Sequence, residues 1–363
     1  MERIDREYIE LYPVNWHVLT DTELKGMLHT VSLEKLKEIN LYVHIPFCSQ
    51  ICQWCTFNKM LYNKAVYDEY IKALINEISM FKGHPDFIGR KVTAIYFGGG
   101  TASLLEPKDV ESILGAITTY FPVSRDAEIT VESHPSTLNP QKLGSYKDAG
   151  VNRLSIGVQS FNDNNLKNLG RTNNERINES ALNDAKAIGF RRIVIDFMYH
   201  LPKQTMADFL NDLKKIDELA PDGLSAYSLV AGETPFESKL KDIQPDKVDQ
   251  EMYYAIKDHL ESLDYAMFTP YDFAKKGKEC RYVMNAWKSP QQLLLGFGAG
   301  AQSHYFGGYI STNIYPVNTY VKAVNSGILP WMLGSHLTKE DLMAKYMVLG
   351  VRGLEINKII ATQ

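Results

Sequence analysis

The chain has 363 residues, of which 45% are hydrophobic and 23% charged, a balance typical of a globular protein with an apolar core. A formal net charge of −4 argues against nucleic-acid binding through a basic surface. The sequence contains no run of about 18 apolar residues that would predict a membrane span. The polar N-terminus lacks the apolar core of a signal peptide. We therefore expect a cytoplasmic protein with neither nucleic acid nor membrane as a partner.

Short apolar runs rich in β-branched and aromatic residues predict buried strands. In chain order they are Ile39–Ile45, Val92–Phe97, Glu128–Glu132, Arg153–Ile156, Arg192–Phe197 and Gly223–Leu229. Helical periodicity is found between them, at Val66–Met80, Pro107–Thr119, Pro140–Ala149, Asn174–Ile188 and Met206–Leu219. This alternation predicts βαβ units with a parallel sheet, hence an α/β fold with a partial (β/α)6 TIM-like barrel. The loops at the carboxyl ends of its strands should carry the chemistry.

Two segments flank the expected barrel, which we place at residues 39–235. Residues 1–38 predict a polar, helical N-terminal lead-in. Beyond residue 235 the alternation weakens, so residues 236–363 predict a smaller, reduced C-terminal α+β region. Its features are a helix near Asp246–Leu263, a glycine-rich stretch at Leu295–Gly300, and a capping box at Thr338–Asp341 that opens a helix through Leu349.

Three of the four cysteines, Cys48, Cys52 and Cys55, follow the first predicted strand with C-x₃-C-x₂-C spacing. Three thiolates on one loop can bind three irons of a [4Fe–4S] cluster and leave the fourth iron open to a chelating substrate. The alternatives are a zinc knuckle or inert core cysteines. Zinc usually takes four ligands, often as two pairs, and a second pair is missing; Cys280 and a nearby histidine would have to complete the site. The spacing, with Trp54 before the last cysteine, favours the cluster.

Two more patterns end predicted strands. The glycines of Gly98–Gly100, before Thr101, would let backbone N–H groups approach an anionic or zwitterionic ligand, although a tight turn alone would use the same residues. Glu132 ends the third predicted strand. A carboxylate there is costly unless it is paired or binds a ligand, although a solvated strand-end acid is the commoner case.

The string Tyr42-Val-His-Ile-Pro-Phe-Cys48, with the later cysteines and Phe57-Asn-Lys59, resembles the oxygen-independent coproporphyrinogen III oxidase family, the HemN/HemW-like branch of the radical S-adenosylmethionine (SAM) superfamily. The resemblance runs from about Asn40 to Leu354. It implies that Cys48, Cys52 and Cys55 form the catalytic metal site. There a [4Fe–4S] cluster would cleave SAM reductively to a 5′-deoxyadenosyl radical, with an external electron donor such as flavodoxin or ferredoxin.

The resemblance also implies contacts with SAM. The residues that would bind the cofactor at the cluster are Tyr42, Trp54, Gly99, Gly100, Thr101 and Glu132. Gln159, Arg171 and Asp196 match positions that, in the coproporphyrinogen enzyme, serve two SAM molecules, one on the cluster and one beside it. We expect these three side chains, with Asp196 closing the fifth strand, to converge on one mouth of the barrel.

Departures from the family narrow the function. Phe57 stands where the oxidase branch has a further cysteine, and Tyr282–Trp287 retains only the tryptophan of the heme chaperones' His-Asn-x-x-Tyr-Trp motif. Both SAM sites are matched, which resembles HemN-like class C methylases. The leading hypothesis is methyl or methylene transfer from a second SAM to an sp² carbon of a small molecule, for which an aromatic compound or a tetrapyrrole is suited. The alternatives are tetrapyrrole oxidation, as in coproporphyrinogen oxidation or anaerobic heme degradation, and a non-enzymatic heme chaperone.

Overall fold

The computed structural model describes residues 17–18, 20, 38–52, 55, 57–83, 90–229, 242–243, 245–287, 293–305 and 308–352. It shows a mixed α/β fold, as predicted. The described residues form two compact units. The β2 unit takes those within 17–49, 58–130 and 280–352, and the β7 unit takes those within 50–57 and 131–279. These units group residues by contact, so the division predicted along the chain at residues 38 and 235 stays a prediction.

The sheet of the β2 unit is mixed. Its strands, in spatial order, are β1 (His17–Val18), β15 (Trp331–His336), β14 (Tyr309–Asn313), β13 (Gln302–His304), β12 (Leu293–Phe297), β2 (Glu38–Ile45), β5 (Lys91–Gly99) and residues 123–130 of β6 (Val123–Ser133), whose last three residues belong to the β7 unit. β2 lies between two parallel neighbours, with Tyr42 opposite Tyr96 on one side and Gly296 on the other. The side chains of Leu41, Val43 and Phe97 are buried in the core.

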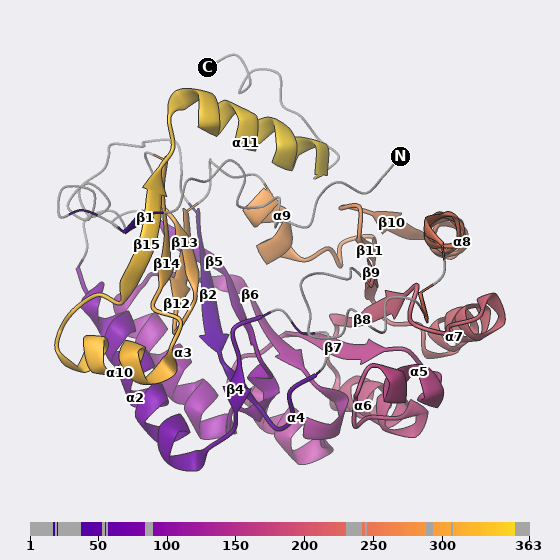
Figure 1. Ribbon diagram of the computed structural model, residues 1–363. Coiled ribbons are helices and arrows are strands. Elements are labelled where there is room, and N and C mark those ends of the chain that lie inside the picture. The colour runs from indigo at the N-terminus through magenta and orange to yellow at the C-terminus, as the bar shows by residue number, and fades with distance from the viewer. Residues whose placement is uncertain are drawn as a thin grey trace. The chain divides into compact units, whose positions relative to one another are not determined.

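The helices of the β2 unit are α2 (Lys64–Met80), α3 (Pro107–Tyr120), α9 (Arg281–Trp287), α10 (Val317–Asn325) and α11 (Lys339–Arg352) (Figure 1). The predicted capping box of the last helix is confirmed. Thr338 Oγ1 accepts from the Asp341 amide at 3.1 Å, while the Thr338 amide donates to the Asp341 carboxylate at 3.0 Å. No helix in the described part of the chain is long and apolar enough to cross a membrane.

The predicted helical lead-in falls mostly outside the described residues, but its described part is a strand. His17 and Val18 form β1, which pairs antiparallel with Gly334 and Leu333 of β15. The prediction of helix is therefore wrong at these two residues, because an edge of the sheet offers them backbone partners that no local sequence pattern indicates.

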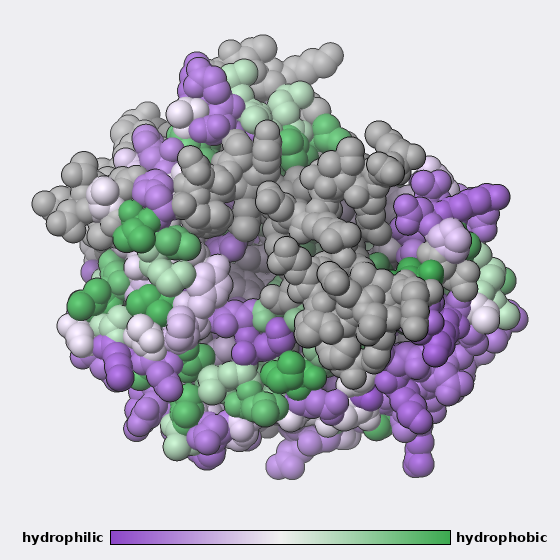
Figure 2. All heavy atoms as spheres, in the orientation of Figure 1, coloured by the Kyte–Doolittle hydropathy of each residue, from purple (hydrophilic) through white to green (hydrophobic). Residues whose placement is uncertain are grey.

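The β7 unit contains the parallel strands β7 (Arg153–Gln159), β8 (Ile193–Tyr199) and β9 (Gly223–Ser228), extended by the antiparallel β11 (Asp272–Lys275) and β10 (Tyr265–Met267). Its helices are α4 (Pro140–Asp148), α5 (Asp163–Asn168), α6 (Glu175–Ile188), α7 (Met206–Leu219) and α8 (Asp246–Ser262). Figure 2 shows mostly hydrophilic side chains over α6 and α7, whose other faces bury Leu182 and Phe209.

The predicted core strands and helices all occur, with bounds shifted by a few residues. Helix α7 has its predicted bounds because Thr205 and Asp208 form a capping box at its start. Strand β8 is longer than predicted, since Met198 and Tyr199 still pair with Tyr227 and Ser228. Asp196 therefore lies in the middle of this strand, and the prediction that it closes the strand is wrong.

Candidate active site

Four of the predicted site residues share one property. Each is half-buried in a strand whose neighbouring residues are largely buried: Tyr42 in β2, Glu132 in β6, Gln159 in β7 and Asp196 in β8. Tyr96 in β5, which was not among the predicted residues, has the same character. Polar or amphipathic side chains that break a buried run in this way mark positions reachable by solvent or a ligand.

Backbone hydrogen bonds fix Cys48 from two sides. Strand β3 (Phe47–Cys48) pairs in parallel with β4 (Met60–Leu61), and the Tyr62 amide donates to the Cys48 carbonyl at 2.8 Å. On the other side, the Thr101 amide donates to the Phe47 carbonyl at 2.8 Å. The buried Cys48 is thus held by the chain segments around it.

Glycines at the end of β5 make this close packing feasible. A Cβ atom at Gly100 would lie 2.8 Å from Cys48 Sγ and 2.9 Å from the Phe47 carbonyl oxygen. At Gly99, with φ +121°, a Cβ would lie 2.8 Å from the Ile45 carbonyl oxygen. The tight approach therefore requires glycine at both positions.

The predicted use of N–H groups in this loop needs correction. The Gly100 and Thr101 amides donate to the carbonyls of Ile45 and Phe47, both at 2.8 Å, so they already have protein acceptors. The amino group of SAM needs acceptors in any case, which carbonyl and hydroxyl oxygens supply. The prediction that Gly99, Gly100 and Thr101 contact SAM stays open, but not through these two N–H groups.

Aromatic side chains cluster around Tyr42. Its ring lies 6.3 Å from that of Tyr96, nearly parallel, and 6.3 Å from that of Tyr282, while Tyr96 and Tyr282 are 4.8 Å apart. The Tyr42 hydroxyl lies 3.1 Å from His44 Nδ1. Burial lowers the pKa of His44 to about 4, so its ring is neutral at physiological pH.

In the β7 unit a guanidinium lies beside the other two cysteines of the motif. Arg171 is in hydrogen-bonding contact with Cys52 and close to Cys55. Burial lowers the pKa of Arg171, and the neighbouring Cys52 and Asp196 oppose that shift. A partly buried cation suits a site whose ligands carry negative charge, as thiolates do.

The structure brings together Gln159, Arg171 and Asp196. Arg171 Nη2 donates to the Gly157 carbonyl at 2.6 Å. Gln159 Nε2 and Arg171 Nη2 both flank Gly157, 3.1 and 3.4 Å from where its Cβ would be. Asp196 accepts from Ser155 Oγ at 3.0 Å, and burial raises its pKa to about 6. Gln159 itself has φ +67°, a left-handed conformation that is uncommon for this residue type.

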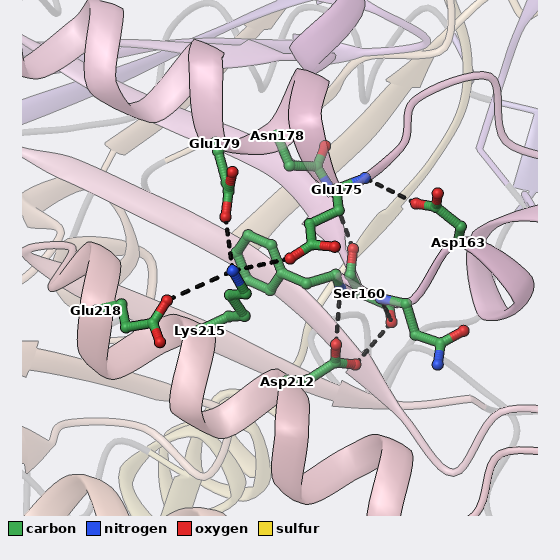
Figure 3. Close-up of polar contacts among 10 residues, drawn as sticks. Ser160, Asp163, Glu175, Asn178, Glu179, Asp212, Lys215 and Glu218 are labelled. Atoms are coloured by element: carbon green, nitrogen blue, oxygen red, sulfur yellow. Dashed lines mark hydrogen bonds and ion pairs between the residues drawn. The ribbon is translucent and has the colours of Figure 1, made fainter.

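A buried polar network that sequence reasoning missed supports Arg171. Asp212 of α7 accepts from Ser160 Oγ at 2.6 Å and from the Phe161 amide at 2.8 Å (Figure 3). Asn178 of α6 donates to the Ser160 carbonyl at 3.0 Å. Asn173 donates to Asn178 Oδ1 at 2.8 Å and accepts from Arg171 Nε at 2.9 Å. The available signal was polar residues at buried positions of amphipathic helices, Asn178 in α6 and Asp212 in α7.

The donor chemistry fits the predicted cluster. All four cysteines are free thiols, and the three of the motif have a glycine cradle at Cys48 and a guanidinium at Cys52. Within the described ranges, no three His, Cys, Asp or Glu side chains form a preassembled metal site. Cys280 is buried and lies 3.4 Å from Glu128 Oε1, a contact that occupies it within the β2 unit. Trp54 lies outside the described residues.

Known proteins are similar to this chain in sequence and in fold. The family model described as the Radical SAM superfamily matches residues 42–216. The heme chaperone HemW of Bacillus subtilis is 33% identical over 86% of this chain and 82% of its own. The oxygen-independent coproporphyrinogen III oxidase of Salmonella typhimurium is 30% identical over 93% and 76%. The solved structure of coproporphyrinogen III oxidase (HemN) from Escherichia coli, titled a radical SAM enzyme, matches with a TM-score of 0.80 and 27% identity over 93% and 79%.

Proposed function

Because the chain belongs to the HemN/HemW family of the radical SAM superfamily, we propose that it cleaves SAM reductively and transfers a methyl or methylene group from a second SAM to an sp² carbon of a small molecule. The observation that supports this most is the convergence of Gln159, Arg171 and Asp196 around Gly157, beside Cys52. The alternative is that Arg171 and Asp196 form an ion pair that only holds adjacent loops together.

The residues divide into two roles. Cys48, Cys52 and Cys55 would hold the [4Fe–4S] cluster, which supplies the electron for SAM cleavage when bound and is reduced by a donor such as flavodoxin or ferredoxin. Tyr42 and the carboxylate of Glu132 would bind the first SAM, since both offer oxygen acceptors to its ammonium and ribose groups.

The second SAM would lie against Arg171. A guanidinium can bind a carboxylate bidentately, and Asp196 can accept from amine or ribose donors. Arg171 already uses Nε and Nη2 for Asn173 and Gly157, so its orientation is fixed before any ligand arrives. Gln159 Nε2 lies on the same side of Gly157 and would add a donor.

A second candidate is oxidation of a tetrapyrrole. The cluster of Tyr42, Tyr96 and Tyr282 offers flat aromatic surfaces, and relatives carry the names coproporphyrinogen oxidase and heme chaperone. The chaperone role is less favoured, because Tyr282 stands where the heme-chaperone motif has histidine and its ring packs on Tyr96.

Product analysis tests the proposal. Protein reconstituted anaerobically with iron and sulfide should hold about four irons per chain. With a reductant and a substrate it should form both 5′-deoxyadenosine and S-adenosylhomocysteine. Formation of 5′-deoxyadenosine alone would favour oxidation, and formation of neither with all candidate substrates would favour a carrier.

Variants assign the residues. Cys52→Ala should abolish SAM cleavage, whereas Cys280→Ala should retain the cluster because Cys280 contacts Glu128 instead. Equilibrium dialysis should find two SAM molecules per wild-type chain. Arg171→Ala should remove one of them and spare the other. A wild-type stoichiometry of one, measured with substrate present, would contradict transfer from a second SAM.

A further inference from the structure

Asn58 connects three parts of the β2 unit. Its Nδ2 donates to the Ala299 carbonyl at 2.9 Å and to the Tyr315 carbonyl at 3.1 Å. Its own carbonyl oxygen lies 2.9 Å from His44 Nε2. Asn58 also begins the return segment whose strand β4 pairs with β3, the strand that contains Cys48. One side chain therefore links the β3–β4 pair to residues 241 and 257 positions away in the sequence.

The glycine-rich stretch after β12 is shaped around this contact. A Cβ at Gly300, where φ is +76°, would lie 2.8 Å from Asn58 Nδ2. A Cβ at Gly298, where φ is +101°, would lie 2.7 Å from the His44 carbonyl oxygen. The pattern at Leu295–Gly300, to which the sequence alone assigns no role, thus leaves room for Asn58 and for the end of β2.

Buried side chains hold the turn formed by residues 298–301. Tyr70 donates to the His44 carbonyl at 2.7 Å and accepts from the Ala299 amide at 3.0 Å. Glu77 accepts from the Gly298 amide, from Asn313 Nδ2 and from the Tyr320 hydroxyl, each at 2.7 Å. These bonds fix the turn against α2 and α10, so Asn58 binds to a rigid partner.

The bond from His44 to Asn58 also assigns the histidine tautomer. A carbonyl oxygen only accepts, so Nε2 must carry the proton and Nδ1 of the neutral ring must accept. The Tyr42 hydroxyl, 3.1 Å from Nδ1, is therefore the donor of the hydrogen bond to His44. A hydroxyl that donates can still accept, so the Tyr42 oxygen suits an ammonium or ribose donor of a ligand.

We propose that Asn58 is a positioning residue, which ties the return segment after the cysteine motif to the Gly298–Ala301 turn and, through His44, presents the Tyr42 oxygen as an acceptor for SAM. The proposal rests on the proposed function, because it assigns Tyr42 to the first SAM. It extends that function by giving the C-terminal residues 298–315 a part in building the SAM site.

The test uses Asn58→Asp, which keeps the shape of the side chain. The substitution replaces the Nδ2 group, which donates to two carbonyl oxygens, with a carboxylate oxygen that can only accept. Asn325→Asp, exposed on α10, is the matched control for the added charge. Each full-length protein is reconstituted anaerobically, its iron is counted, and the electron paramagnetic resonance spectrum of the reduced cluster is titrated with SAM. Hydrogen exchange of residues 40–48 is measured on the apoproteins.

We expect Asn58→Asp to bind iron like the wild type but to need about tenfold more SAM for half of the spectral change, because two hydrogen bonds are lost and a carboxylate then faces two carbonyl oxygens. Exchange at residues 40–48 should quicken, with residues 153–159 unchanged. Asn325→Asp should match the wild type in both measurements. A SAM titration of Asn58→Asp that coincides with the wild type would overturn the positioning role.

A second variant keeps the test decisive if Asn58→Asp does not fold. Tyr70→Phe removes the hydroxyl that joins His44 to Ala299 while keeping the ring, and it should weaken the SAM titration in the same direction. An unchanged titration in Tyr70→Phe would then refute the proposal. If instead the wild type itself shows no spectral response to SAM, the proposed function fails, which distinguishes the two outcomes.

Discussion

The two units hold their predicted site residues in place by different means. In the β2 unit Cys48 is fixed by main-chain hydrogen bonds and by the close approach of Gly100, which leaves no room for a side chain between the two segments. In the β7 unit Arg171 is fixed by a chain of side-chain hydrogen bonds through Asn173 and Asn178. A close main-chain contact cannot accommodate an added atom without moving the chain, whereas the remaining side chains of a hydrogen-bond network can rearrange when one member is removed. We therefore expect abrupt mutational effects in the first region and graded effects in the second.

The largest effect should come from Gly100→Ala. The added Cβ would lie 2.8 Å from Cys48 Sγ and 2.9 Å from the Phe47 carbonyl oxygen, so the cysteine segment must shift. We expect cluster assembly to fail, measured as iron bound per chain after reconstitution. Gly115→Ala is the control: nothing lies within 4 Å of its Cβ in helix α3, and alanine there should stabilise the fold by about 0.5–1 kcal/mol. Normal iron binding by Gly100→Ala would show that the β2 unit is less rigid than we infer.

A graded effect is expected at Asp212. Asp212→Ala leaves the buried Phe161 amide without its acceptor, which should lower the free energy of unfolding by about 1–3 kcal/mol. Asp212→Asn keeps one acceptor oxygen and should fall between alanine and the wild type, in urea unfolding and in binding of the second SAM. Equal and complete loss in both variants would mean that this network behaves like the main-chain contact at Cys48.

The pH dependence of stability tests His44. Burial holds its folded pKa near 4, against 6.5 when unfolded, so only the unfolded chain takes up this proton between those values. The stability that the neutral ring contributes is fully present above pH 6.5 and is lost as pH falls toward 4, by about 2 kcal/mol at pH 5. Urea unfolding of the apoprotein at pH 7 and pH 5 measures this loss. His44→Asn should be less stable at pH 7 but should lose less on acidification, and an equal loss in both proteins would contradict the assignment.

The smallest effect should be at the surface of the β7 unit. Lys215 forms ion pairs with Glu175, Glu179 and Glu218 at 2.8, 2.9 and 3.4 Å (Figure 3). These groups are partly solvated and screened, so Lys215→Ala should change stability little, and less still in high salt. The neighbouring exposed Lys214→Ala is the control. Thermal unfolding at two salt concentrations measures the difference, and a salt-independent loss would indicate that Lys215 acts through packing.

The elements of the fold could be predicted from sequence because local patterns specify them. Helix α7 combines a capping box with apolar residues at helical spacing, and β2 and β5 are largely apolar and buried. The end of β8 was missed for the opposite reason. Asp196 interrupts an apolar run. A polar residue in such a run indicates the end of a strand unless its side chain is reachable by solvent or a ligand.

The site could be predicted only as a set of residues. Gln159 ends β7 and Arg171 lies in the connection that follows it, between α5 and α6, and the structure shows the two side chains together at Gly157. The contact of Asn58 with Ala299 does not follow from any spacing, because 241 residues separate the partners. The use of the Gly100 amide within the protein was likewise hidden, since glycine next to a cysteine motif suits both a ligand and a tight chain crossing.

The left-handed backbone of Gln159 has a consequence for how this position tolerates change. A residue with a side chain pays about 1 kcal/mol or more for such a conformation, whereas glycine adopts it freely. Gln159→Gly should therefore make the protein harder to unfold while removing the amide beside Arg171. A screen for thermal resistance alone should favour glycine at this position, whereas a screen for product should reject it.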